Sequence, residues 1–512
     1  MPRRRLTLPS LLLASFVVAL DTTIVNVALP TLIRELDAST SELQWIVGAY
    51  SLVFAALLLA AGSLSDRVGR KGTLLVGLAV FGLASAVGGL TDDPDQLIAA
   101  RAVMGLGAAL IFPATLSLIS NIYVERAERA RAIGLWGAAT GAAVALGPIV
   151  GGWLLEAFSW SAIFFAMAPI AAVAAALIAS SVPTSRDPSA PRADPPGLVL
   201  STAAIGLLTY TIIEAPERGW GEGRTVGGFA AAAVLLAAFV VWQRRAREPL
   251  LDVSLFRNLR FTAASASVTI VYFSLAGFLF LITQYFQFIK GYGPLSTGVR
   301  MLPVALSLVP MSVIGTKFAV RYGTKVVVSA GLVCLAGFFV WVSTDDAGTS
   351  YAVIASQMVL SGIGMGLSAA PATEAIMGVV PKAKAGVGSA VNDATRILGA
   401  ALGVAVIGSV YASVYSSKLT DALPAGLPGP EAQAADASIG AALEIAERAG
   451  STIGAQLHAA ASNAFFDGMS SGLLVAGGVA AFGALLAAAL LPAQPVVSPD
   501  ASSLPPAMPV AE

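Results

Sequence analysis

The stretch LLLASFVVALDTTIVNVALP, from Leu11 to Pro30, is long and apolar enough to cross a bilayer as one helix. Yet it contains Asp21 and Asn26. A carboxylate in hydrocarbon is costly, and such residues usually face a bundle interior or a wet cavity where they serve function. We therefore expect other helices to surround Asp21 and to expose it alternately to the two sides of a membrane.

The composition is that of a membrane protein. Of the 512 residues, 56% are hydrophobic and only 12% are charged, whereas a soluble domain carries about 25% charged residues. The mean hydropathy is +0.80. The formal net charge of zero argues against a nucleic-acid partner. One cysteine (Cys334) and one histidine (His458) are too few for a thiolate or zinc site, so no metal or cofactor is expected.

Fourteen segments are long and apolar enough to span a bilayer. They lie near residues 9–30, 45–64, 73–90, 97–120, 131–156, 160–181, 197–214, 226–243, 262–285, 298–318, 325–343, 350–379, 386–414 and 468–491. Cytoplasmic loops carry the excess of lysine and arginine. With the N-terminus inside, 21 of the 30 such residues fall on the cytoplasmic side and 6 fall outside. This bias predicts that both termini are cytoplasmic.

Breaks in the apolar pattern divide the chain into parts. Residues 1–182 and 256–491 are each expected to form a six-helix bundle, and residues 183–255 hold linkers and two inserted helices. Within the second bundle, residues 416–463 are expected to form a long outer loop with one short amphipathic helix. Residues 492–512 are rich in proline and alanine and are expected to form a disordered cytoplasmic tail.

A short basic loop recurs after the second helix of each half. GSLSDRVGRKG runs from Gly62 to Gly72, and TKFAVRYGTK runs from Thr316 to Lys325. Parallel repeats of two such halves are the mark of one large class of transporter. The matching positions are Arg67 with Arg321, Gly69 with Gly323, and Lys71 with Lys325.

The first copy of this loop combines glycines, an acid and bases between two helices. Glycine permits the tight turn, and Asp66 can accept a hydrogen bond from a helix N-terminus or pair with a base of a neighbouring bundle. We expect pairs that form in one conformation and break in the other, and so decide which side is open. A plain basic loop is the alternative. The candidate gating residues are Gly62, Asp66, Arg67, Gly69, Arg70 and Lys71.

Taken together, these motifs resemble a known family. The loop from Gly62 to Lys71 resembles the signature loop of the major facilitator superfamily, and LDTTIVNVALP (20–30) resembles the helix-1 motif of its fourteen-helix drug:proton antiporters. RAVMGLGAA (101–109) looks like the helix-4 arginine motif, and LGPIVGG (146–152) looks like the helix-5 antiporter motif. The resemblance implies an all-α integral membrane protein of the major facilitator fold, with two six-helix bundles, an inserted helix pair and 14 transmembrane helices.

The helix-5 motif consists of Gly147, Pro148, Gly151 and Gly152. These residues remove side chains and one backbone donor, so the helix can bend there and pack closely against a partner. Close packing alone is the alternative explanation. In the family that the chain resembles, this motif is associated with exporters, and the resemblance therefore implies the direction of transport.

Asp21 and Arg101 are expected to pair. Asp21 lies about nine residues before Pro30, and Arg101 enters its helix a few residues from the outer face. At about 1.5 Å per residue their depths differ by roughly 6 Å, which an arginine side chain can span. The proton occupancy of this pair, direct or through water, would change with conformation. Snorkelling of Arg101 to the outer interface is the alternative.

The second half carries buried charges of its own. Asp393 and Arg396 are three residues apart and can pair along one helix face. Exporters that the chain resembles also place acids on this helix, which are implicated in coupling or in binding cationic substrates. An ion pair that only orients the helix is the alternative. Residues that could line a substrate cavity are Asn26, Glu374 and Asn392.

The sequence offers no competing chemistry. It has no GxxxxGK[ST] phosphate loop, so ATP is not expected as the energy source. It has no nucleophile elbow, so an enzyme is not expected. The resemblance, together with an acid inside a span, implies proton-coupled export of hydrophobic or cationic small molecules by alternating access, as in multidrug efflux and antibiotic resistance. The alternatives are export of an endogenous lipid, siderophore or secondary metabolite, and a non-transporting sensor or scaffold.

The expected partners are a small-molecule substrate, protons and the lipid bilayer, without nucleic acid. We expect a monomer that crosses a bacterial cytoplasmic membrane many times.

Overall fold

The computed structural model describes residues 2–123, 125–186, 194–380 and 385–491. The regular elements within these ranges are all helical. Across the same ranges, fourteen helical segments are long and apolar enough to cross a membrane, which agrees with the number predicted from the sequence. The expected disordered tail (492–512) lies outside the described residues, and so do Arg192, Lys382 and Lys384, which count among the predicted cytoplasmic bases.

The N-terminal bundle contains the first six spans. α1 (Pro2–Ile24) continues through a 3₁₀ turn, η1 (Val25–Ala28), into α2 (Leu29–Leu36), and the three form one span. A reciprocal capping box between Ser39 and Glu42 starts the next helix. The remaining helices are α3 (Thr40–Val68), α4 (Arg70–Gly88), α5 (Pro94–Ile122), α6 (Arg126–Ala157) and α7 (Ser161–Ser181).

The inserted pair and the C-terminal bundle complete the chain. The inserted pair consists of α8 (Pro195–Arg218) and α9 (Gly223–Arg245). The C-terminal bundle consists of η2 (Val253–Arg257), α10 (Leu259–Gln284), the π-helical turn η3 (Tyr285–Ile289), α11 (Pro294–Arg300), α12 (Leu302–Tyr322), α13 (Thr324–Val342), α14 (Tyr351–Val379), α15 (Ala385–Ala422), α16 (Gly429–Ala437), α17 (Ile439–Arg448) and α18 (Ser451–Leu490).

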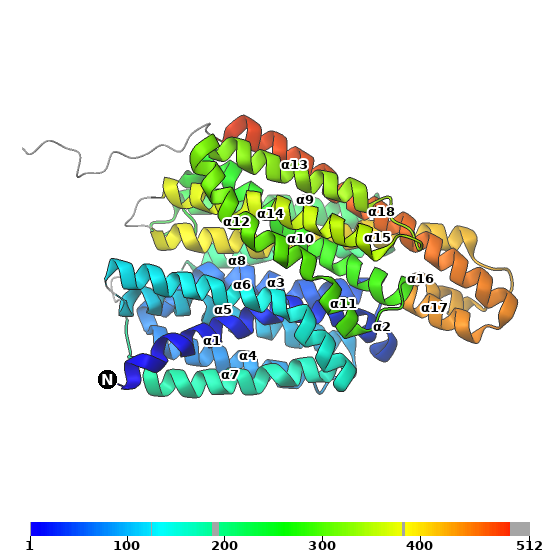
Figure 1. Cartoon of the computed structure of the whole chain (residues 1–512), viewed down its shortest axis with the longest axis horizontal. Coiled ribbons are helices and arrows are strands. Elements are labelled where there is room, and N and C mark those ends of the chain that lie inside the picture. The colour runs from blue at the N-terminus through cyan, green and yellow to red at the C-terminus, as the bar shows by residue number, and fades with distance from the viewer. Residues whose placement is uncertain (1, 124, 187–193, 381–384, 492–512) are drawn as a thin grey trace, which may run out of the picture.

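The two bundles lie side by side with their helices running along the long axis of the molecule (Figure 1). One end, here called the basic end, carries the N-terminus (left in Figure 1). The loop with Arg67, Arg70 and Lys71 lies at the same end, because Lys71 and Thr7 both donate to backbone carbonyls in the last turn of α7. At the other end, the α16–α17 end, these two short helices project beyond the bundles. The first span of each bundle is well buried: the apolar window is 78% buried in Leu6–Leu36 and 72% buried in Leu259–Ile289. Asp21 therefore lies on a central helix.

The inserted pair contacts both bundles. α8 packs against α3 of the N-terminal bundle and α15 of the C-terminal bundle. Near the α16–α17 end, Ser41 Oγ donates to Glu217 Oε1 at 3.1 Å, and Trp220 Nε1 donates to Ser413 Oγ at 3.3 Å. α8 thus lies along the seam where α3 and α15 meet, and α9 packs against α8.

The repeated basic loop has the same backbone form in both bundles. Gly69 separates α3 from α4 with φ +137°, and Gly323 separates α12 from α13 with φ +90°. L side chains rarely adopt such positive φ values, so glycine is required at both turns. The sequence repeat therefore corresponds to a structural repeat.

The bundles are held together at the α16–α17 end. Hydrogen bonds between them join Thr40 Oγ1 to Ala437 O (2.9 Å), Gln287 Nε2 to Val27 O (2.8 Å), Leu295 N to Glu156 Oε1 (3.0 Å), and Ser409 Oγ to Gln44 Oε1 (3.1 Å). Helix α6 is likewise more deeply buried at the α16–α17 end than at the basic end. Toward the basic end it buries one face, at Ala132, Trp136 and Ala143, and exposes many other residues, whereas its glycines near residue 150 are buried. The structure is therefore closed at the α16–α17 end.

Residues 416–463 differ from the expected loop. They are largely helical, because α15 continues to Ala422, α16 and α17 follow, and α18 begins at Ser451. The expected amphipathic helix is two short helices. α17 buries Ile439 and Ile445 and packs against α18. The sequence pattern did not predict this helical content, because alanine-rich sequence favours helix only where a neighbouring surface accepts its apolar face.

Candidate functional site

Asp21 and Arg101 form a direct ion pair inside the N-terminal bundle. Arg101 Nη1, on α5, donates to Asp21 Oδ2, on α1, at 2.6 Å. The two side chains are 2% and 0% exposed, respectively. Snorkelling of Arg101 to the interface does not fit a side chain buried to this degree. Asp21 Oδ1 accepts no hydrogen bond from the described residues, so half of the carboxylate has no donor.

Arg101 is held by more than its acid. Its Nε donates to the backbone carbonyl of Ile46 at 3.0 Å, and its Cζ lies 4.3 Å from the centroid of the Tyr50 ring. Ile46 and Tyr50 are one turn apart on α3. The Tyr50 hydroxyl donates to Val18 O on α1 at 3.2 Å. Three helices therefore surround one buried cation.

The glycines of the helix-4 motif explain why α5 can approach so closely. A Cβ added at Gly105 would lie 2.5 Å from Tyr50 O, and a Cβ added at Gly107 would lie 2.7 Å from Phe81 N on α4. No real side chain tolerates these distances, so both positions need glycine. Gly105 lies one turn after Arg101, and the close approach it allows places the guanidinium over the Tyr50 ring.

Asn26 lies in the 3₁₀ turn that interrupts the first span. It is 3% exposed, and its Nδ2 donates to the carbonyls of Thr22 and Thr23 at 3.3 Å each. In this conformation the side-chain amide donates to carbonyls of its own span and is buried, so the structure does not place it against an open cavity. The neighbouring Val27 carbonyl is the one that receives Gln287 from the opposite bundle.

The helix-5 motif packs against α1 on one side and α11 on the other. A Cβ at Gly147 would clash with Thr23, and one at Gly151 would lie 2.8 Å from Ile24 O. A Cβ at Gly152 would lie 2.5 Å from Pro294 O of the C-terminal bundle. Pro148 is also part of this contact, because a side chain at Gly298 would clash with its carbonyl. The motif therefore lies at the closed contact between the bundles.

The candidate gating loop is held within its own bundle. Asp66 Oδ1 accepts from Arg70 Nε at 2.6 Å and from Ser117 Oγ of α5 at 2.8 Å. Arg70 N donates to Ser185 O at 3.0 Å, and Lys71 Nζ donates to Ala179 O at 2.8 Å. These contacts tie the loop to α5, α7 and the segment after α7.

The remaining loop residues take structural or exposed positions. Gly62 lies beside Pro113 of α5, Gly69 makes the turn with positive φ, and Arg67 is partly exposed. A base of the other bundle, which the sequence left open as a partner for Asp66, is not among the acid's hydrogen-bond partners in the described chain.

The charges of the second half form a looser cluster. Asp393 Oδ1 and Arg396 Nη1 are 3.9 Å apart, with side chains 15% and 32% exposed. Arg396 Nη2 donates to Thr373 Oγ1 of α14 at 3.2 Å, and Thr373 Oγ1 donates to Asn392 Oδ1 at 3.0 Å. The cluster thus joins α14 to α15. Glu374, the next residue on α14, is exposed.

Two acids outside the spans have shifted pKa values. Burial alone would raise the pKa of Asp194, but hydrogen bonds from Trp242, Gly197, Gln243 and Leu250 lower it below its ordinary value. Asp194 thereby joins α8, α9 and the segment after α9, a role that sequence analysis missed.

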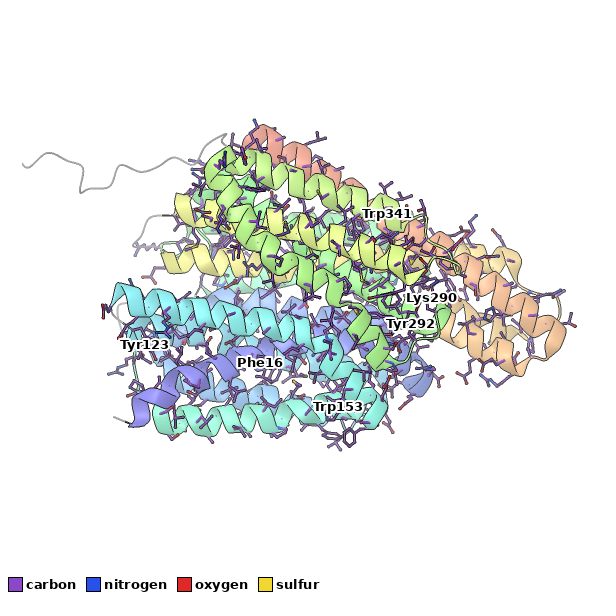
Figure 2. All side chains as sticks on the ribbon, viewed as in Figure 1. Phe16, Tyr123, Trp153, Lys290, Tyr292 and Trp341 are labelled. Atoms are coloured by element: carbon purple, nitrogen blue, oxygen red, sulfur yellow. The ribbon has the colours of Figure 1, made fainter. Side chains whose placement is uncertain are left out.

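Asp345 lies in the turn between α13 and α14. Burial raises its pKa to about 6, although its hydrogen bond from Gln357 at 2.7 Å acts in the opposite direction. The turn is held by Lys290, which Figure 2 shows near the α16–α17 end. Its Nζ donates to Ala347 O at 2.7 Å and to Thr349 O at 2.5 Å.

Sequence analysis also missed Tyr50 and Gln287. Both occur in apolar runs and neither belongs to a recognised motif. A tyrosine between Ala49 and Ser51 within a long apolar span is an ordinary core residue, so only the position of its ring beside Arg101 distinguishes it. Among the residues that the structure describes, no group of three or more histidine, cysteine, aspartate or glutamate side chains could hold a metal ion.

Comparison with known proteins agrees with this geometry. The family model described as Major Facilitator Superfamily matches residues 11–404. The chain is 35% identical to the multidrug efflux pump LfrA of Mycolicibacterium smegmatis, over 93% of this chain and 94% of that protein. It is 34% identical to the methyl viologen resistance protein SmvA of Salmonella typhimurium, over 93% of this chain and 96% of that protein. By its name LfrA is an efflux pump, which is a transporter rather than an enzyme.

A solved structure shows the same fold. It is the crystal structure of a bacterial homologue of the human lysosomal transporter Spinster, described as inward-facing and unoccupied. The two agree with a TM-score of 0.69 at 17% sequence identity, over 96% of this chain and 98% of that one. The matched family model, the similarity to efflux proteins along nearly the whole length and the shared fold lead to one conclusion: this chain belongs to the major facilitator superfamily of multi-pass membrane transporters.

Proposed function

We propose that this protein exports hydrophobic or cationic small molecules across a bacterial cytoplasmic membrane in exchange for protons. The Asp21–Arg101 pair carries the proposal. An acid inside a span is retained for function, and this one is fully buried beside Arg101, with one oxygen that has no hydrogen-bond donor among the described residues. A proton on Asp21 would neutralise the carboxylate and leave Arg101 as the charged member of the pair. The packing energy of α1 against α5 would therefore change.

Transport would proceed by alternating access between the two bundles. The structure is closed at the α16–α17 end, where Gly152 meets Pro294 and Gln44 meets Ser409. Opening that end requires these contacts to separate while the basic end closes. The excess of lysine and arginine supports a cytoplasmic position for the basic end, so this conformation would load substrate from the cytoplasm or the inner leaflet.

The substrate class follows from the relatives and the accessible acids. LfrA is named as a multidrug efflux pump and SmvA as a methyl viologen resistance protein, which supports toxic small molecules as the substrates. Asp21 is fully buried and paired, whereas Asp393 is partly exposed and Glu374 is exposed. We therefore assign attraction of cationic substrates to the acids of the C-terminal bundle and proton exchange to Asp21.

Efflux of a lipophilic cation dye from cells, with and without an uncoupler, tests the proposal. Asp21→Asn should abolish the part of efflux that the uncoupler inhibits. Asp37→Asn is the matched control, because Asp37 is exposed and its φ of +52° suits asparagine equally well. Size-exclusion chromatography of each variant checks folding. Uncoupler-sensitive efflux that is unchanged in a folded Asp21→Asn protein would exclude Asp21 as the coupling residue.

A further inference from the structure

Tyr50 contacts Arg101 and also the backbone of α1 close to Asp21. Its ring face lies 4.3 Å from Arg101 Cζ, and its hydroxyl donates to Val18 O, three residues before Asp21 on α1. The whole side chain is 1% exposed. Ile46 O, one turn earlier on α3, accepts from Arg101 Nε. One turn of α3 thus provides a carbonyl and an aromatic face for the same guanidinium.

The position of the ring is over-determined. Gly105 lets α5 approach the Tyr50 backbone, Phe54 packs edge-on against the ring at 5.8 Å, and the hydroxyl is anchored on α1. A ring held on three sides cannot turn its face away from Arg101 without disturbing α1, α3 and α5 together.

The ring affects the two protonation states of Asp21 differently. An aromatic face is electron-rich, so it attracts a guanidinium. When Asp21 is ionised, the carboxylate already neutralises Arg101 and the ring adds little. When Asp21 is protonated, Arg101 becomes an unneutralised buried cation, which then depends on Ile46 O and the Tyr50 ring.

We propose that Tyr50 is a positioning residue for proton coupling, which favours the protonated state of Asp21 by hosting Arg101 in that state. The inference rests on the proposed coupling role of Asp21. Of the described groups on α5, α6 and α7, which pack against α1, and on α3, the charged or titratable ones that face Asp21 are Arg101 and Tyr50 itself. Among the described residues, Arg101 and the Tyr50 ring are therefore the groups through which the protonation of Asp21 is influenced.

Infrared titration of the purified protein measures the inference directly. The carboxyl band of Asp21 is identified as the band lost in Asp21→Asn, and its midpoint pH is then followed in ring variants. Tyr50→Leu should lower the midpoint by about 0.5–1 pH unit, because a desolvated cation–π contact is of that order. Tyr50→Phe keeps the ring face and should restore most of the wild-type midpoint.

A fluorinated series removes the risk that Tyr50→Leu does not fold. Phenylalanine and its mono-, di- and trifluorinated forms at position 50 weaken the negative ring face stepwise at nearly constant shape, and the midpoint should fall stepwise. The same series at Phe54, which touches the Tyr50 and Phe112 rings, is the matched control and should leave the midpoint unchanged.

A flat response at position 50, an equal response at Phe54, or the absence of any Asp21 band that titrates would overturn the inference. Failure of the proposed function would give a different experimental result. Normal uncoupler-sensitive efflux in Asp21→Asn would remove the coupling role, while the infrared midpoint would still report whether the ring tunes Asp21.

Discussion

Removal of Arg101 should expose the energetic cost of burying Asp21. In Arg101→Leu the carboxylate, which is 0% exposed and otherwise paired at 2.6 Å, loses its only cation among the described residues. It can remain charged, at about 3–5 kcal/mol for an uncompensated buried ion, or it can take up a proton. From the ordinary aspartate value of about 3.9, protonation at pH 7 costs about 4 kcal/mol. We therefore expect a loss of stability of about 4 kcal/mol at pH 7.

The cost should depend on pH in a predictable way. Proton uptake becomes cheaper by about 1.4 kcal/mol for each unit of decreasing pH, so the loss should shrink to about 1.5 kcal/mol at pH 5. The double variant Asp21→Asn/Arg101→Leu has no buried charge and should lie within about 1 kcal/mol of the wild type at both pH values.

Unfolding by sodium dodecyl sulfate in mixed micelles, followed by the fluorescence of the seven tryptophans, gives the four corners of this cycle. A matched control is Arg34→Leu, because Arg34 is exposed at the end of α2. The reasoning fails if Arg101→Leu is as stable as the wild type, if its loss of stability is the same at pH 5 and pH 7, or if the double variant is no more stable than Arg101→Leu.

Three further predictions follow from single positions. Gly152→Leu should prevent closure against Pro294 and abolish efflux without unfolding the protein, whereas Gly141→Leu on the same helix, where a Cβ meets nothing within 4 Å, should be tolerated; dye efflux and size-exclusion chromatography compare them. Gly69→Ala should reduce stability by about 1–2 kcal/mol because its φ is +137°, while Gly72→Ala, inside α4, should raise it by up to about 1 kcal/mol, both measured by unfolding in micelles. Burial raises the pKa of Asp345 to about 6, so the cost of its charge appears as the pH rises through that value: Asp345→Asn should stabilise the protein by about 1 kcal/mol at pH 8, after allowance for screening by water, and should change nothing at pH 4. A stabilisation that is equal at both pH values would contradict this assignment.

The spans could be predicted because the bilayer leaves few options. A chain in hydrocarbon must satisfy every backbone hydrogen bond internally, so each long apolar run becomes a helix. The prediction of helices was less complete outside the spans, where lipid does not constrain the backbone. Residues 416–463 are too polar for a span, and their helices depend on apolar faces such as that of Ile439 and Ile445 finding a neighbour. That is a tertiary property, which local sequence does not contain.

The motif glycines show the same division. Gly147, Gly151 and Gly152 are recognisable from sequence as positions without side chains, and close packing can be inferred from them. Which neighbour each one admits cannot be inferred. Gly147 and Gly151 admit α1 of the same bundle, whereas Gly152 admits α11 of the other. The rotation of α6 about its axis and the approach of the two bundles decide this.

Asp21 could be placed inside a span from sequence alone, because an acid in this apolar run has no other position, and Arg101 could be placed within its reach, because helix rise sets its depth. The packing of three helices shows that the two side chains meet directly, that one carboxylate oxygen has no donor in the described part of the chain, and that Tyr50 and Ile46 complete the shell around Arg101. The physical reason is sequence separation. Residues that lie about 30 to 80 positions apart meet only when three helices adopt particular rotations and the small side chain of Gly105 lets two of them touch.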